Sequence, residues 1–176
     1  MKHLIDGKVA VTNNSVMKFL ESTITKGSSL LDIGCGPKLY SNAFKNKCSK
    51  ILTVDAWKKL KPDVVADLEA ERIADVVKNE KFDYIIMLDF IEHLDKEKGK
   101  QLIEDCKSIC NKKIILFTPL EEIWTDNHHN VEDESLWCFG NEYDHHKSVW
   151  SKDDFPGWTH LDIPKLRKYY FGYYDV

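Results

Sequence analysis

The sequence predicts an α/β fold built around a mostly parallel sheet. Between about residues 29 and 119, short apolar runs alternate with amphipathic segments of helical spacing. The first of these runs leads directly into the turn Gly34-Cys35-Gly36. Strands that alternate with helices are typical of a parallel sheet whose faces are covered by helices.

The first elements surround that turn. A leading helix is expected over Thr12 to Thr25, where apolar side chains recur at helical spacing after two capping asparagines. The apolar run Ser29 to Ile33 stops at Gly34 and predicts the first strand. A further helix is expected from about Leu39, with its first amide N–H groups facing the turn.

The alternation continues to residue 119, with further strands at apolar runs and helices at amphipathic segments. The expected strands are Ile51 to Val54, Val64 to Ala66, Phe82 to Leu88 and Lys113 to Phe117. The expected helices are Leu68 to Lys78 and Lys96 to Cys110.

The last third of the chain has a different texture. From Trp124 to Val176 it holds 12 of the 20 aromatic residues. We expect a long aromatic and acidic loop from Glu121 to Trp150. Strands at Trp158 to Ile163 and Lys168 to Tyr174 would then form a hairpin that closes the sheet.

Composition limits the class of protein. With 176 residues, 43% apolar and 31% charged, the sequence predicts one soluble domain over residues 1–176. Its five cysteines form no Cys-x-x-Cys pair, and no leading segment reads as a secretion signal, so we expect a reduced, cytoplasmic protein. No apolar stretch approaches the roughly 18 residues of a spanning helix, so no membrane insertion is expected.

The charge distribution disfavours nucleic acid as a partner. The net charge is −4, and the segment from Trp124 to the end holds 5 basic against 10 acidic residues. Proteins that bind a phosphate backbone usually carry the opposite bias.

The glycine turn predicts a nucleoside ligand. Glycines at 34 and 36 let the backbone approach a ligand at the carboxyl edge of the sheet, and Asp55 follows 19 residues later at the end of the second strand. A dinucleotide site would need a third glycine where this chain has Leu39. Asp32 would repel a pyrophosphate but suits a ligand with ammonium and sulfonium groups.

These residues, with three further stretches, resemble the class I S-adenosylmethionine-dependent methyltransferase family. The resemblance covers about residues 28 to 119 and is carried by four elements in register. They are Leu30-Leu31-Asp32-Ile33-Gly34-Cys35-Gly36-Pro37, Asp55, Asp67-Leu68 and Phe82-Asp83-Tyr84-Ile85-Ile86-Met87-Leu88-Asp89-Phe90-Ile91-Glu92-His93-Leu94. It implies a three-layer α/β/α, doubly wound sheet of about seven strands with a reversed last strand, and S-adenosylmethionine as cofactor.

The resemblance also implies roles for single residues. The methionine part of the cofactor would lie on the turn, and the adenosine part on residues after the second, third and fourth strands. The implied contacts are Asp32, Gly34, Cys35, Gly36 and Pro37 for methionine, Asp55 for ribose, Ala56, Trp57, Asp67 and Leu68 for adenine, and Leu88, Asp89 and Phe90 for the cofactor's other side. Lys38 departs from the family, in which many members have a third glycine there.

Two histidines are candidate catalytic bases. His93 follows the fourth strand, and His146 belongs to a segment that loosely resembles one in related methyltransferases. A hydroxyl acceptor would need a base, and histidine suits that role near neutral pH. The alternative to a histidine base is a metal site on His128, His129, His145 and His146 with Asp126 or Asp144. Adjacent histidines chelate one ion poorly, so no metal is expected.

The sequence thus predicts methyl transfer to a small-molecule or sugar-like acceptor, with oxygen as the acceptor atom. Selectivity would come from the leading helix and the aromatic segment 120–176. The alternative is a non-catalytic, S-adenosylmethionine-binding regulatory or interaction module.

Overall fold

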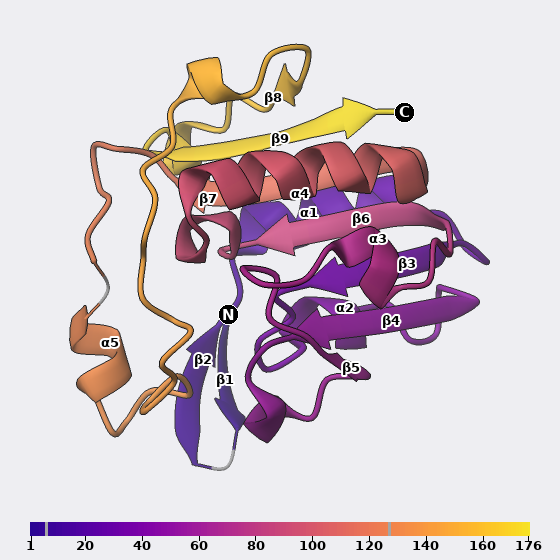
Figure 1. Cartoon of the computed structure of the whole chain (residues 1–176). Coiled ribbons are helices and arrows are strands. Elements are labelled where there is room, and N and C mark those ends of the chain that lie inside the picture. Colours follow the sequence, from indigo (N-terminus) through magenta and orange to yellow (C-terminus); the bar gives the residue numbers. More distant parts are fainter. Residues whose placement is uncertain (6, 127) are drawn as a thin grey trace.

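The computed structural model describes residues 1–5, 7–126 and 128–176, without the side chains of residues 128 and 129. Its centre is a seven-stranded sheet in the order β5-β4-β3-β6-β7-β9-β8 (Figure 1). These strands span Ser29–Ile33 (β3), Lys50–Asp55 (β4), Val64–Val65 (β5), Phe82–Leu88 (β6), Cys110–Pro119 (β7), Thr159–His160 (β8) and Tyr169–Asp175 (β9). The pairs among β3, β4, β5, β6 and β7 are parallel, and β9 runs antiparallel to both β7 and β8. This reversed strand confirms the predicted fold class.

Helices cover both faces of the sheet, which gives three layers (Figure 1). The α-helices are α1 (Asn14–Thr23), α2 (Leu39–Ala43), α3 (Ile73–Val76), α4 (Lys96–Ile109) and α5 (His128–Glu132). Short 3-10 helices are η1 (Lys58–Leu60), η2 (Ile91–His93), η3 (Lys152–Asp154) and η4 (Pro164–Leu166). Among these helices, none is long and apolar enough to cross a bilayer in the part of the chain that the structure describes.

The two faces of the sheet bury separate cores. In β6, Ile85 and Met87 pack with α3 and α4, whereas Ile86 and Leu88 pack with α1 on the other face. These side chains on both faces of β6 are nearly inaccessible to solvent, so the sequence of this part of the strand is a continuous apolar run without alternating polar residues. This double burial explains why the central strands could be predicted from short apolar runs.

The predicted helix at residues 68–78 is wrong in length. Regular helix covers only Ile73–Val76, because the chain enters it from Arg72 in an extended conformation. The preceding residues form a separate turn closed by bonds to the Asp67 carbonyl. Lys78 and Asn79 then take positive φ values, which end the helix.

An N-terminal hairpin was not predicted. Strands β1 (Lys2–Ile5) and β2 (Lys8–Val11) pair antiparallel. β2 also contacts the aromatic segment: the Val9 amide donates to the Ser135 carbonyl at 2.8 Å, and the Trp137 amide donates to the Val9 carbonyl at 3.2 Å. The hairpin thus holds part of the aromatic segment beside the carboxyl edge of the sheet.

Candidate functional site

The glycine turn follows β3 at the carboxyl edge of the sheet. Gly34 and Gly36 have φ values of +66° and +49°, a region that side chains other than glycine rarely adopt. Other side chains occupy the space that a Cβ would fill: the Phe90 ring lies against Gly34, and the Trp137 indole lies over Gly36. The two glycines are therefore required both by the backbone and by close packing.

Asp55 connects the end of β4 to this turn. Its Oδ2 atom accepts a hydrogen bond from the Gly36 amide at 2.9 Å, and Oδ1 accepts one from the Trp57 amide at 2.8 Å. Each carboxylate oxygen has two acceptor positions, so Asp55 retains capacity for ligand hydroxyls. Burial raises the pKa of Asp55.

A narrow cleft opens between the ends of β3, β4 and β6. Six of the predicted contact residues line it: Gly34, Asp55, Ala56, Asp67, Leu68 and Phe90. Its walls combine apolar side chains with a few carboxylates, which is the usual chemistry of a nucleoside pocket. These residues fit the adenosine part of the cofactor.

The other predicted contacts lie around this cleft rather than in its lining. Asp32 is buried in β3, and burial, with the nearby charge of Asp55, raises its pKa to about 7. Cys35 is buried in the turn, Pro37 and Trp57 are half-buried, and the Leu88 side chain packs in the core beside α1. Asp89 lines a neighbouring cleft instead.

Lys38 stands where the family resemblance would place a third glycine. It precedes α2 in the left-handed conformation, with φ +60° and ψ +30°. Its Nζ donates to the Lys61 carbonyl. The turn therefore keeps the wound shape that a glycine would give it, at a cost in backbone strain.

The neighbouring cleft is wider and more open to solvent than the first. It is formed by the start of α1, Asp89, Phe117 and residues near η4, including Tyr169. The charges of Asp89 and Glu92 contribute to the raised pKa of Tyr169 after burial, so both carboxylates lie near this cleft. It is the candidate acceptor site, and the predicted leading helix contributes to it.

The two candidate histidines lie together because the aromatic segment returns to η2. The amides of Lys147 and Ser148 both donate to the Glu92 carbonyl, at 2.7 and 3.1 Å. The His93 ring donates from Nδ1 to the His145 carbonyl at 3.2 Å. The centroids of the His93 and His146 rings are 4.8 Å apart.

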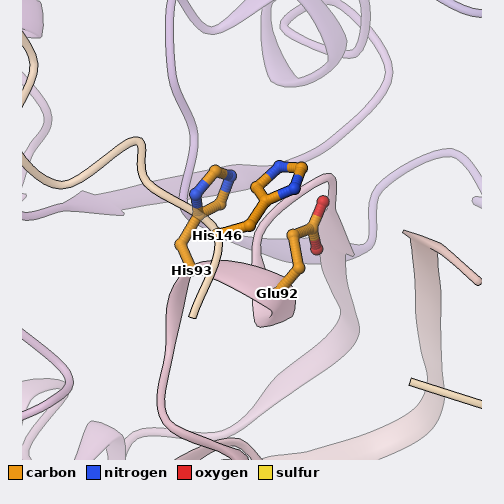
Figure 2. A group of neighbouring side chains, drawn as sticks. All are labelled: Glu92, His93 and His146. Atoms are coloured by element: carbon orange, nitrogen blue, oxygen red, sulfur yellow. The ribbon is translucent and has the colours of Figure 1, made fainter. Parts of the chain in front are cut away.

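Glu92 completes a cluster with these histidines (Figure 2). Its side chain is buried, and Oε2 accepts a hydrogen bond from the Thr118 hydroxyl at 2.8 Å. Burial and the charges of Asp89 and Asp144 raise the pKa of Glu92. Burial lowers the pKa of His93 to about 3 and also lowers that of His146, so both rings are neutral at pH 7.

Glu92 is a member of the cluster that the sequence does not predict as a site residue. The pairing depends on a contact between residues more than 50 positions apart, which no local pattern reports. Of the metal ligands considered from sequence, the side chains of His128 and His129 lie outside the described residues. Asp144 lies near the cluster, with Oδ1 4.0 Å from His93 Nε2.

Three solved structures share this fold. A SAM-dependent methyltransferase from Archaeoglobus fulgidus is 15% identical, with 94% of this chain and 95% of that chain covered and a TM-score of 0.61. Magnesium protoporphyrin IX methyltransferase from Synechocystis, solved with bound SAH, is 14% identical over 92% and 80%, with a TM-score of 0.58. Small RNA methyltransferase HEN1 is 15% identical over 93% of this chain and 26% of that chain, with a TM-score of 0.61.

The family comparison goes further than shared fold. No curated protein sequence matches the chain significantly. The methyltransferase domain family, however, matches residues 7–160, which include the glycine turn, the lining residues of the first cleft and the histidine cluster. The chain therefore belongs to the class I S-adenosylmethionine-dependent methyltransferases, with S-adenosylmethionine as its cofactor.

Proposed function

We propose that this enzyme transfers a methyl group to a hydroxyl oxygen of a small-molecule or sugar-like acceptor. The observation that carries the proposal is the cluster of Glu92, His93 and His146, in which His93 lines the first cleft. A hydroxyl acceptor needs a general base that takes up its proton as the methyl group is transferred, and a neutral imidazole beside carboxylates can act as that base.

The chain's own residues supply position and electrostatics. The cofactor, when bound, supplies an activated methyl group. Asp55 and Asp67 would accept hydrogen bonds from the nucleoside, while the carboxylate of Asp32 would favour the positive charge of the methionine part. Phe90 would contact the cofactor from the side of β6. Cys35, Gly36, Pro37, Ala56, Trp57, Leu68, Leu88 and Asp89 remain the further predicted contacts.

Asp89 links the two clefts. It follows β6, lines the second cleft, and precedes Phe90 in the first. An acceptor held in the second cleft would therefore face the cofactor across this junction, and His93 lines the cofactor side of it. Methyl transfer needs mainly such alignment and the exclusion of water.

A small acceptor fits better than RNA. HEN1 shares the fold and is described as a small RNA methyltransferase, so RNA is the second acceptor class to test. The net charge of −4 and the acidic final third disfavour a phosphate backbone.

The five cysteines are all free, which supports a reducing, cytoplasmic setting.

Transfer of labelled methyl groups tests the proposal. The full chain would be incubated with methyl-labelled S-adenosylmethionine and either a small-metabolite extract or short RNAs. We expect label in small hydroxyl compounds, and loss of most of it with His146→Ala but not with His160→Ala. Label on RNA alone, or on nitrogen or carbon, would contradict the proposed acceptor.

A non-catalytic binding module is the second candidate. The packing of Trp137 on Gly36 favours it, because the indole stands where the methionine part is expected. The same assay separates the candidates: cofactor binding without transfer to either acceptor pool would favour the module.

A further inference from the structure

We propose that Glu92, His93 and His146 form a binding site for a divalent transition-metal ion, with Asp144 as the nearest further ligand. The sequence predicted no metal. The proposal rests on where the fold places these side chains, which come from η2 and from the returning aromatic segment (Figure 2).

The ligand atoms are already close to one another. One ring nitrogen from each histidine and a Glu92 oxygen all lie within 4.8 Å of one another. A metal with bonds of about 2.0–2.2 Å holds neighbouring ligand atoms roughly 3–3.5 Å apart. Small side-chain rotations would therefore close the site without a backbone rearrangement.

Hydrogen bonds orient the ligands for this role. Because His93 donates from Nδ1 to the His145 carbonyl, its Nε2 carries the lone pair and points towards Asp144. Such a bond to the second ring nitrogen is typical of histidines that bind metals. The Thr118 hydroxyl similarly holds one oxygen of Glu92.

Two features of the cluster are otherwise unexplained. Nδ1 of His146 is buried and lacks a hydrogen-bond partner among the described residues, although buried polar atoms nearly always have one. Glu92 is only 1% exposed and lies near the charges of Asp89 and Asp144. A divalent cation would bond to the histidine and offset the repulsion among the carboxylates.

The ligand types indicate which metals fit. Two imidazoles with one carboxylate suit Zn²⁺, Co²⁺, Mn²⁺ or Fe²⁺, whereas Mg²⁺ and Ca²⁺ prefer sites made of oxygen atoms. Three protein ligands leave at least one coordination position open.

That open position suggests a use, which rests on the proposed function. A hydroxyl oxygen of the acceptor bound to the metal would lose its proton to water more easily. The two histidines would then hold the metal instead of taking up that proton themselves. The new O–C bond would then form as the S–C bond of the cofactor breaks and its electron pair returns to sulfur.

Cobalt is the most direct probe, because its visible spectrum reports the ligand geometry. The full chain, treated with a chelator and dialysed, would be titrated with Co²⁺ alone. We expect visible bands that saturate at one equivalent and disappear on adding Zn²⁺. His146→Ala and Glu92→Gln should each weaken binding at least about tenfold. His160 lies on β8, outside the cluster, so the His160→Ala variant should bind Co²⁺ as tightly as the wild type does.

Thermal unfolding of each variant, measured without metal, shows whether it is folded. The absence of cobalt bands in the folded wild type would overturn the proposal, as would equal affinities of wild type and folded His146→Ala. Because no acceptor is present, these outcomes do not depend on the proposed methyl transfer. Conversely, cobalt binding with no labelled product would leave the metal site standing and contradict the acceptor proposal.

Discussion

Asp32 is the residue whose charge depends most directly on the cofactor. Burial raises its pKa to about 7, so a large fraction is protonated near neutral pH in the free protein. If the cationic methionine part binds beside Asp32 as proposed, it would stabilise the ionised form, and cofactor binding would release a proton from Asp32.

The affinity for S-adenosylmethionine is therefore expected to rise with pH through about 7 and to level off above it. Below that value the affinity should fall by up to about tenfold per pH unit. Titration calorimetry from pH 5.5 to 8.5 measures this dependence. In Asp32→Asn the step near pH 7 should disappear, and binding at pH 8 should be weaker; a wild-type step retained in Asp32→Asn would contradict the assignment.

Lys38 is strained, and this predicts a stabilising substitution. Lys38→Gly relieves the strain of a left-handed backbone and should raise the free energy of unfolding by about 0.5–1 kcal/mol. For a chain of this size, that corresponds to a rise in Tm of roughly 1–4 °C. Lys98→Gly, on the exposed side of α4, is the matched control and should destabilise by about 1 kcal/mol. Equal melting temperatures for wild type and Lys38→Gly would count against strain.

The sequence could identify residues of the cofactor cleft because they follow consecutive strands. Gly34, Asp55 and Phe90 come after β3, β4 and β6, whose parallel ends meet at one edge. Sequence could not show that Trp137 would cover Gly36 or that His93 and His146 would meet. Both contacts depend on the path of an irregular segment that lacks a repeating pattern.

At the level of elements, α4 is held against the aromatic segment by a glycine. A Cβ on Gly99 would lie 2.7 Å from Cζ2 of Trp150 and 3.0 Å from Cγ1 of Ile91. Trp150 is fully buried, so the ring has little room to move.

Gly99→Ala is therefore expected to destabilise the protein although alanine favours helices. The higher helix propensity of alanine would stabilise the protein by about 1 kcal/mol, but overpacking would cost about 1–3 kcal/mol. The free energy of unfolding, measured in urea, should therefore fall by up to about 2 kcal/mol. Adding Trp150→Phe should relieve part of the overpacking and restore part of the lost stability. A double-mutant cycle measures this coupling between the two sites. A net gain in the single variant would disprove the close contact.

Elements were predictable to different degrees. The expected bounds of β3 and β6 agree with the structure, because both strands are buried on two faces. The N-terminal hairpin was missed, although the pair Asp-Gly at positions 6 and 7 is a hairpin signal in the sequence. Its strands are only four residues long and are partly exposed, so their apolar period is weak.

For the whole molecule, the cofactor half follows the family pattern, whereas the hairpin and the aromatic segment build the surroundings of the cleft. The bridge between Val9 and Leu136 joins these two parts beside the glycine turn. We therefore propose that selectivity for the acceptor comes from these segments, which local sequence patterns describe least.

The central claim is that S-adenosylmethionine binds in the cleft formed by the glycine turn and Asp55. Isothermal titration of the full chain with this cofactor tests it most directly, with Asp55→Ala as the site variant. Asp162→Ala, an exposed residue that lines neither cleft, is the control. We predict one site per chain in the wild type and the control, and markedly weaker binding in Asp55→Ala. No heat of binding in the wild type at high cofactor concentration, or unchanged affinity in Asp55→Ala, would contradict the claim.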